Sequence, residues 1–158
     1  MSGETLRTYL NDHLAGSVAA VELLDHLMEL DAGRKTFYLR LKSDIQDDQA
    51  VLKEVLNRAG GTESTLRKAA AWLSERLSQM KIAVDDAGDN QLSVLQSLEI
   101  LALGIQGKLL LWRALGSAAP RIPALASYDY RRLQGRAQAQ FEEVEAERVK
   151  LAGAALPA

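Results

Sequence analysis

The apolar residues of this sequence recur three and four positions apart over most of the chain, the spacing that lines one face of an α-helix. In the first predicted helix, residues 4–31, this seam consists of Leu6, Leu10, His13, Ser17, Ala20, Leu24 and Leu27. In the second, residues 35–58, it consists of Tyr38, Leu41, Ile45, Asp48, Leu52 and Val55. Gly33 and Gly60 follow the two segments, where a helix is expected to stop. The pattern therefore predicts two long amphipathic helices joined by a short turn.

Three further segments show the same helical spacing. Residues 64–83 have a seam of Leu66, Ala70, Leu73, Leu77 and Met80. The apolar stripe of residues 91–116 is centred on Val94, Leu98, Leu101, Ile105 and Trp112. The seam of residues 125–152 consists of Tyr130, Leu133, Ala137, Gln140, Val144 and Leu151. Because no stretch alternates apolar and polar residues for long enough to indicate a sheet, we expect an all-α protein with one domain over residues 1–158.

The lengths of the helices and links constrain how the helices connect. Four of the predicted helices are about 36 to 42 Å long at 1.5 Å per residue. The links after the first and the fourth are short, so each of these pairs should form an antiparallel hairpin. The helix at 64–83 lies between the hairpins and is long enough to return the chain to the end that it left. This predicts a ferritin-like four-helix bundle with a long crossover containing an extra helix. A five-helix up-down array is the alternative.

Composition and charge exclude several classes of function. The formal net charge is −2, and acidic and basic residues are interspersed, so no basic patch for nucleic acid is expected. The cluster Arg131, Arg132 and Arg136 is local, is followed by glutamates, and is typical of a solvated helix face. The chain has no cysteine, which excludes disulfides, thiolate catalysis and cysteine-ligated zinc.

The most apolar run, VLQSLEILALGIQGKLLLW, is interrupted by Gln96, Glu99, Gln106 and Lys108. It is therefore expected to be a buried helix and not a membrane span. The N-terminal stretch MSGETLRTYLNDH lacks a basic segment followed by an apolar one, so no signal peptide is predicted. We expect a cytoplasmic protein with no membrane partner.

Three segments carry a resemblance to a known family: YLNDHLAGSVAAVEL, RKAAAWLSERL and LEILALGIQGKLLLWRAL. Together they resemble an uncharacterised family of bacterial proteins of this length, and YLNDHLAG is the most specific element. The resemblance extends over nearly the whole chain. It implies a ferritin-like bundle without an assigned role.

Ferritin-like di-iron proteins combine a carboxylate from each of two helices with a Glu-x-x-His pair from each of the other two. This sequence has two histidines, both in the first predicted helix, and no Glu-x-x-His. We therefore expect no di-iron site and no cofactor. The alternative is a remnant or carboxylate-only site for iron or manganese, for which the ligands would be Glu99, Asp48 and His13.

His13 and Asp48 lie on the seams of the first two helices, and a turn near residue 33 would bring them within about 5 Å along the axis. The structural interpretation is a buried pair, because a buried polar group without a partner costs about 1–3 kcal/mol. The catalytic interpretation is a base oriented by a carboxylate, with Ser17 as the nucleophile. A serine in the middle of a bundle helix lacks free amides to stabilise an oxyanion, so the structural interpretation is favoured.

The fourth predicted helix carries Glu99, Gln106 and Arg113 at seven-residue spacing, near the edge of its apolar stripe. If this row faces inward, Glu99 can form an ion pair with Arg148; if it faces outward, it is solvated. Together with His13 and Asp48, the candidate buried polar groups are thus Glu99, Gln106 and Gln140.

The fourth predicted helix is apolar over more of its circumference than a surface helix requires. Gly104 and Gly107 would let another backbone approach closely, so we expect a homodimer through this helix. The expected function is non-enzymatic: a structural, ligand-binding or interaction role. The alternative function is metal binding.

Overall fold

The computed structural model describes residues 2–62 and 90–156, together with Arg67, Ala71, Glu75 and Ser78. Its long elements are α1 (Ser2–Leu30), α2 (Lys35–Arg58), α4 (Asn90–Ala118) and α5 (Tyr130–Ala155). Short 3₁₀ turns are η1 (Ala32–Arg34), η2 (Ala119–Arg121) and η3 (Pro123–Leu125). All elements in the described ranges are helical, which confirms the predicted all-α class.

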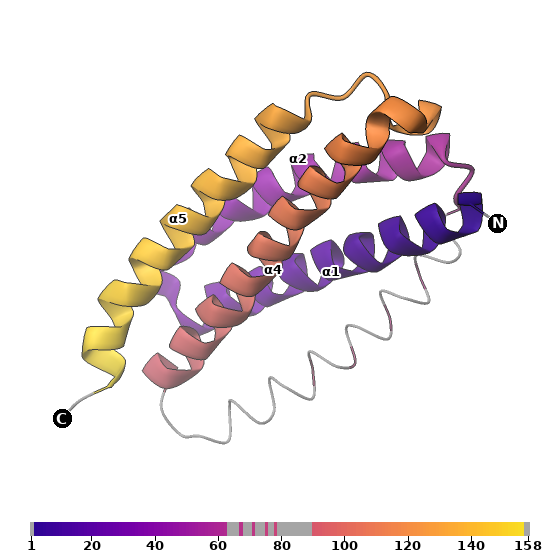
Figure 1. Cartoon of the computed structure of the whole chain (residues 1–158). Coiled ribbons are helices and arrows are strands. Elements are labelled where there is room, and N and C mark those ends of the chain that lie inside the picture. The colour runs from indigo at the N-terminus through magenta and orange to yellow at the C-terminus, as the bar shows by residue number, and fades with distance from the viewer. Residues whose placement is uncertain are drawn as a thin grey trace.

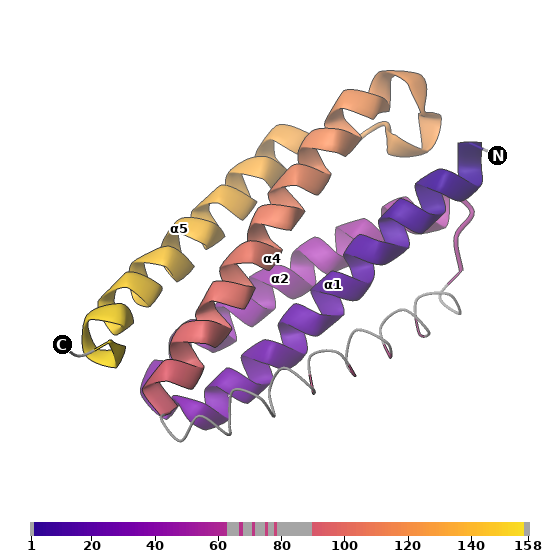
Figure 2. The same cartoon turned by 60° about the horizontal axis from the view of Figure 1, so that its bottom comes forward.

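The four long helices pack lengthwise as two hairpins, α1 with α2 and α4 with α5 (Figures 1 and 2). Two hydrophobic clusters mark the two ends of this bundle. One cluster contains Leu27, Tyr38, Val94 and Leu151, and the other contains Leu10, Leu56, Leu115 and Leu133. The start of α4 therefore lies at the same end of the bundle as the start of α2, so α2 and α4 run in the same direction.

The predicted seams of α2 and α5 and the predicted stripe of α4 are buried at every position named above. The α1 seam is only partly correct. Leu14, Ala15, Ala19 and Leu23 are buried in α1 although they lie outside the predicted seam. The buried surface of α1 is therefore wider than one helical stripe, and His13 lies at its margin, half-buried.

Local chemistry explains where α2 ends and where α5 begins. After Arg58, Gly60 adopts φ 75°, and the amide of Gly61 donates to the carbonyl of Leu56 at 2.9 Å, a left-handed helix stop that favours glycine. The expected start of the last helix at 125 is wrong. The Asp129 carboxylate accepts from the amide of Arg132 at 3.0 Å and caps the helix there.

The fourth helix extends two residues beyond the predicted stop at Gly116, to Ala118. A side chain at Gly116 would approach the Cβ of Tyr130 to 3.1 Å, so this glycine lets the start of α5 pack closely against the end of α4. Most of the predicted helix 64–83 lies outside the described residues; the four that are described within it are helical and exposed.

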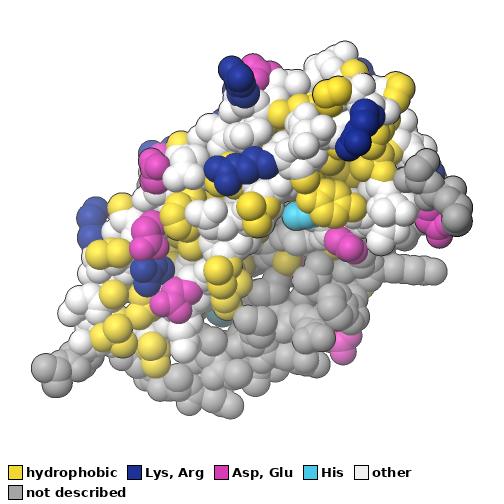
Figure 3. All heavy atoms as spheres, viewed as in Figure 1, with side chains coloured by type: hydrophobic (Ala, Val, Ile, Leu, Met, Phe, Trp, Pro, Cys, Tyr) yellow, Lys and Arg dark blue, Asp and Glu magenta, His cyan; other side chains and the backbone are white. Residues whose placement is uncertain are grey.

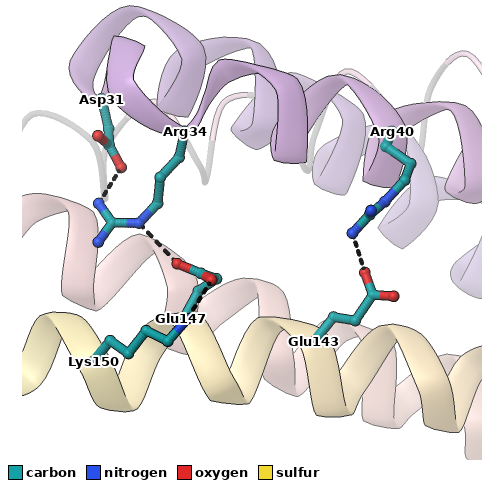
Figure 4. A network of polar contacts seen from close by, with 6 residues as sticks. All are labelled: Asp31, Arg34, Arg40, Glu143, Glu147 and Lys150. Carbon is teal, nitrogen blue, oxygen red and sulfur yellow. Dashed lines mark hydrogen bonds and ion pairs between the residues drawn. The ribbon is translucent and has the colours of Figure 1, made fainter.

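Polar contacts join the outer surfaces of α2 and α5 (Figure 4). The Arg34 guanidinium donates to Glu147 at 3.0 Å and to Asp31 at 2.9 Å, and Arg40 donates to Glu143 at 2.7 Å. The contacts of Arg34 are partly buried, whereas the Arg40–Glu143 pair is exposed. An exposed pair contributes about 0–1 kcal/mol. These contacts align the two hairpins without supplying most of the stability.

One helical stretch of the described chain, the 32 residues Asn90–Arg121, is long and apolar enough to cross a membrane by length and composition. Half of its most apolar window is buried inside the bundle. Core helices of soluble proteins meet the same test, and one face of α4 is buried in this bundle.

A buried ion-pair network beside a candidate ligand cavity

Asp48 is the most deeply buried carboxylate among the described residues, with 2% of its surface exposed. It lies on α2 and accepts hydrogen bonds from the two other helices that face it. Lys108 of α4 donates to Oδ2 at 2.7 Å, Gln140 of α5 donates to Oδ2 at 3.0 Å, and Arg136 of α5 donates to Oδ1 at 3.0 Å. One carboxylate thereby connects three helices and compensates two cationic groups.

Lys108 completes the network from the middle of the apolar α4 helix. Its Nζ donates to the Gln140 carbonyl oxygen as well as to Asp48. Burial lowers the pKa of Lys108 from its ordinary value, and the Asp48 carboxylate opposes this shift. The sequence interpretation had treated Lys108 only as an interruption of an apolar run. The signal that would have identified it is a single lysine within an otherwise apolar stretch, since a buried charge requires a partner.

The expected contact between His13 and Asp48 is not formed. The carboxylate of Asp48 is bonded to α4 and α5, whereas His13 packs edge-to-face on Tyr9, with ring centroids 4.8 Å apart. Burial lowers the pKa of His13, and nearby Asp12 opposes this shift. The reason for the difference is the wider buried surface of α1, which leaves His13 at the margin of the core.

The hydrogen bonds of Ser17 do not fit the role of a nucleophile. Its hydroxyl donates to the carbonyl of Leu14 at 2.7 Å and accepts from the side-chain amide of Gln49 at 2.9 Å. The hydroxyl therefore bonds to groups other than His13, and a Ser/His/Asp trio is not assembled. Instead, the Ser17–Gln49 bond ties α1 to α2 one turn beyond His13.

A cavity of about 220 Å³ lies where α1, α2 and α4 meet. Its polar and charged lining consists of Asp12, His13, Ser17, Asp48, Gln49 and Lys108. Apolar side chains from the three helices form the rest of the wall: Ala20, Ile45, Leu52, Ile105, Leu111 and Trp112. A mostly apolar cavity with a few convergent polar groups is the common form of a small-molecule site.

Three helix glycines line the same cavity, Gly16 on α1 and Gly104 and Gly107 on α4. A Cβ atom added at any of them would meet no atom of the described residues within 4 Å. Glycine in a helix interior is about 0.5–1 kcal/mol less favourable than alanine, so close packing does not explain these positions. Their effect is to widen the space between α1 and α4.

A second hollow of about 350 Å³ lies between α2 and the start of α5. Its charged lining residues are Asp47, Asp48, Asp129, Arg132 and Arg136. Asp48 and Arg136 already bond to one another, and Asp129 caps α5. The lining of this hollow is mostly polar and charged, whereas that of the cavity beside His13 is mostly apolar, so the cavity beside His13 is the better candidate for a small-molecule site.

The remaining candidates do not join this site. Glu99 is exposed on α4, as expected for the outward orientation, yet it also forms the ion pair with Arg148 that was expected for the inward one, at 3.4 Å and near the surface. Gln106 is half-buried and does not line the cavity. In the described part of the chain, no group of three or more histidine, aspartate or glutamate residues is arranged to hold a metal ion. Glu99, Asp48 and His13 therefore do not form a common ligand set.

Comparisons of the chain with models of protein families, with curated proteins and with solved structures gave no match.

Proposed function

We propose that this protein is a non-enzymatic bundle of ferritin-like connectivity that binds a small, mostly apolar molecule in the cavity between α1, α2 and α4. The observation that carries the proposal is the cavity itself. Three glycines leave open space beside apolar walls, and a small set of polar side chains converges on that space.

The direction of the helices supports the ferritin-like part of the proposal. Residue 58 ends α2 at the end of the bundle that contains Leu10, and residue 90 begins α4 at the end that contains Leu27. A link between these two ends has to run the length of the bundle, which is the long crossover of ferritin-like proteins. The resemblance of YLNDHLAG and its companion segments to a bacterial family agrees with this connectivity.

The charges around the cavity favour an uncharged ligand. Lys108 and Asp48 compensate one another, and burial keeps His13 towards its neutral form. Asp12, the remaining charged residue of the lining, is exposed to solvent, so the buried part of the cavity carries no net charge. A charged ligand would add an uncompensated charge to this lining, which is unfavourable in a partly buried site. Trp112 lines the cavity, and its buried Nε1 has no hydrogen-bond partner among the described residues. A small aromatic or aliphatic molecule with one hydroxyl or amide group fits this chemistry best.

The hydrogen bonds around His13 support a non-enzymatic role. Ser17 is bonded to Leu14 and Gln49, and the Asp48 carboxylate is occupied by α4 and α5. Among the described residues, His13 therefore has neither an activated nucleophile nor a carboxylate hydrogen-bonded to its ring. A cavity with such a lining is suited to binding more than to acyl transfer.

Amide NMR tests the proposal directly, because glycine amides are recorded in a distinct region of a ¹H–¹⁵N spectrum. Phenol and indole serve as uncharged probes, with benzoate and benzylamine as charged probes of similar size. We expect saturable shifts at Gly16, Gly104 and Gly107 with the uncharged probes, while Gly135 on the exposed side of α5 stays unchanged. Uniform small shifts at all four glycines, or none, would overturn the proposal.

The same sample distinguishes metal binding, the other candidate function. Paramagnetic Mn(II) broadens amides close to where it binds. Stoichiometric broadening centred on Asp48 or Glu99, and lost in Glu99→Ala, would replace the ligand-binding proposal with a metal-binding one. Broadening spread over exposed carboxylates at high Mn(II) only would leave the cavity proposal in place.

A further inference from the structure

The outer face of α4 is an exposed apolar stripe. Leu103 and Leu110 are 73% and 57% exposed, an unusual degree for leucine in a bundle helix. At helical spacing, Ile100, Gly107 and Ala114 lie on the same side. Figure 3 looks onto the side of the molecule that carries α4 and α5 and shows hydrophobic side chains between acidic and basic ones. Contiguous apolar surface of this kind marks an interaction site.

Charged residues flank this stripe in a self-complementary order. Glu99 stands seven residues before Gln106, and Arg113 stands seven residues after it. Glu99 shares Arg148 with Glu145, so this end of the stripe has two carboxylates for one guanidinium. Arg113 is exposed, and no ion-pair partner is found for it in the described part of the chain. One end of the stripe therefore has an excess acidic group and the other an excess basic group.

We propose that α4 packs antiparallel against α4 of a second copy of this chain, about a two-fold axis that passes close to Gln106. In that arrangement, the flank of α4 that carries Glu99, Gln106 and Arg113 faces the same flank of the second copy. Glu99 then faces the partner's Arg113, and each acidic end receives the missing basic group. Leu103 lies beside the partner's Leu110, and by symmetry Leu110 lies beside the partner's Leu103.

The centre of the stripe fits a close helix pair. Gly107 lies one residue from the axis and has no side chain, so the two backbones can approach each other there. Gln106 meets the partner's Gln106, and the two amides can donate and accept in turn. A second copy is favoured over an unrelated partner because the charged pair Glu99 and Arg113 is centred on Gln106, and the exposed pair Leu103 and Leu110 is centred within one residue of it.

Gly107 borders both the stripe and the cavity, but the charged flank of α4 can be varied without changing the cavity lining. Glu99, Gln106 and Arg113 lie on the flank of α4 away from the cavity and do not line it. Variants at these three positions therefore test the pairing of α4 without altering the candidate ligand site. A dimer that binds no ligand can be distinguished from a monomer that binds one.

Sedimentation equilibrium of the full chain measures the pairing. We expect a monomer–dimer equilibrium, and we expect Arg113→Glu to weaken it at least tenfold because an acidic group then faces Glu99 and Glu145. Arg131→Glu makes the same charge change on α5 and should leave the equilibrium unchanged. Leu110→Lys should abolish the dimer, whereas Leu39→Lys, at an exposed leucine of α2, should not. A monomer at millimolar concentration, or equal weakening by test and control variants, would overturn the proposal.

Cross-linking tests the antiparallel register, because the native chain has no cysteine. Gln106→Cys places one thiol beside the axis, and a short bis-maleimide should join two copies. Glu99→Cys alone should not cross-link, since its two copies would be about 21 Å apart along the axis. A mixture of Glu99→Cys and Arg113→Cys should give a mixed dimer. Efficient cross-linking of Glu99→Cys alone would contradict this register.

A lipid surface is the other occupant that an apolar helix face accepts. Flotation with phosphatidylcholine–phosphatidylglycerol vesicles separates the two. The proposal expects the protein to remain in the aqueous fraction as a dimer. A monomer that floats with the vesicles, and no longer does so after Leu110→Lys, would assign the stripe to lipid and overturn the pairing.

Discussion

Lys108 on α4 and Asp48 on α2 form an ion pair with Nζ 2.7 Å from Oδ2, and both side chains are largely shielded from solvent. The pair lies at the wall of the candidate cavity and reaches α5 through Gln140 and Arg136. A buried pair of this kind is stable only while both members are present, because either one alone is an uncompensated charge.

Replacing the shared carboxylate should be strongly destabilising. We expect Asp48→Ala to lower the free energy of unfolding by about 3–5 kcal/mol, since Lys108 and Arg136 lose their buried counter-charge. Glu143→Ala is the matched control, because Glu143 also joins α2 to α5 by an ion pair but lies at the surface (Figure 4). It should change stability by less than about 1 kcal/mol. Urea unfolding monitored by circular dichroism measures both. Equal losses would show that the network does not hold the helices together.

A double-mutant cycle should show that Asp48 and Lys108 act together. We expect Lys108→Met to be destabilising alone, because it leaves the carboxylate facing fewer donors. In Asp48→Leu/Lys108→Met the loss should be smaller than the sum of the single losses, by about 0.5–3 kcal/mol. Chemical denaturation of the four proteins supplies the cycle. Additive losses would mean that the two residues contribute independently.

The free energy of unfolding should depend on pH through His13. Burial lowers the pKa of His13 in the folded protein below 6.5, while in the unfolded chain it keeps its ordinary value. Between these two values the unfolded state binds more protons, so stability rises with pH towards 6.5 and is lost as pH falls through the folded pKa. His13→Gln should flatten this slope, and His26→Gln should retain it. Denaturant titrations across this pH window make the comparison.

The effect on stability of replacing a glycine with alanine should depend on its φ angle and on the space at its Cβ position. Gly135 lies within α5 with open space at its Cβ position, so Gly135→Ala should raise stability by about 0.5–1 kcal/mol. Gly60 has φ 75°, which disfavours a side chain, so Gly60→Ala should lower stability by about 1 kcal/mol. Thermal unfolding of the two variants measures the signs. A gain at Gly60 would contradict the assigned helix stop.

The periodicity of single helices predicted the buried faces of α2 and α5, because each presents one continuous stripe to its neighbours. It was less accurate for α1, where Leu14 and Leu23 are buried beside the predicted seam and His13 lies at the margin. A repeat within one helix reports the mean direction of its apolar face and not the width of the surface that its neighbours cover.

The partner of Asp48 was missed for a related reason. The sequence interpretation considered only the neighbouring helix of the first hairpin and chose His13, whereas the donors come from the second hairpin. Lys108 and Arg136 lie 60 and 88 residues away along the chain, and their long side chains reach the carboxylate from α4 and α5. Pairing between hairpins depends on how they pack, which the spacing within either hairpin does not specify.

The central claim, that the open space beside Gly16, Gly104 and Gly107 is a ligand site, is tested most directly by calorimetric titration of phenol into three proteins. These are the native protein, Gly104→Leu, which fills the cavity, and Gly135→Leu, which makes the same change on the exposed side of α5. We expect phenol to bind at one site per chain in the native protein and in Gly135→Leu. In Gly104→Leu we expect its dissociation constant to rise at least tenfold. Binding of equal strength in all three proteins, or no binding to the native protein, would contradict this claim.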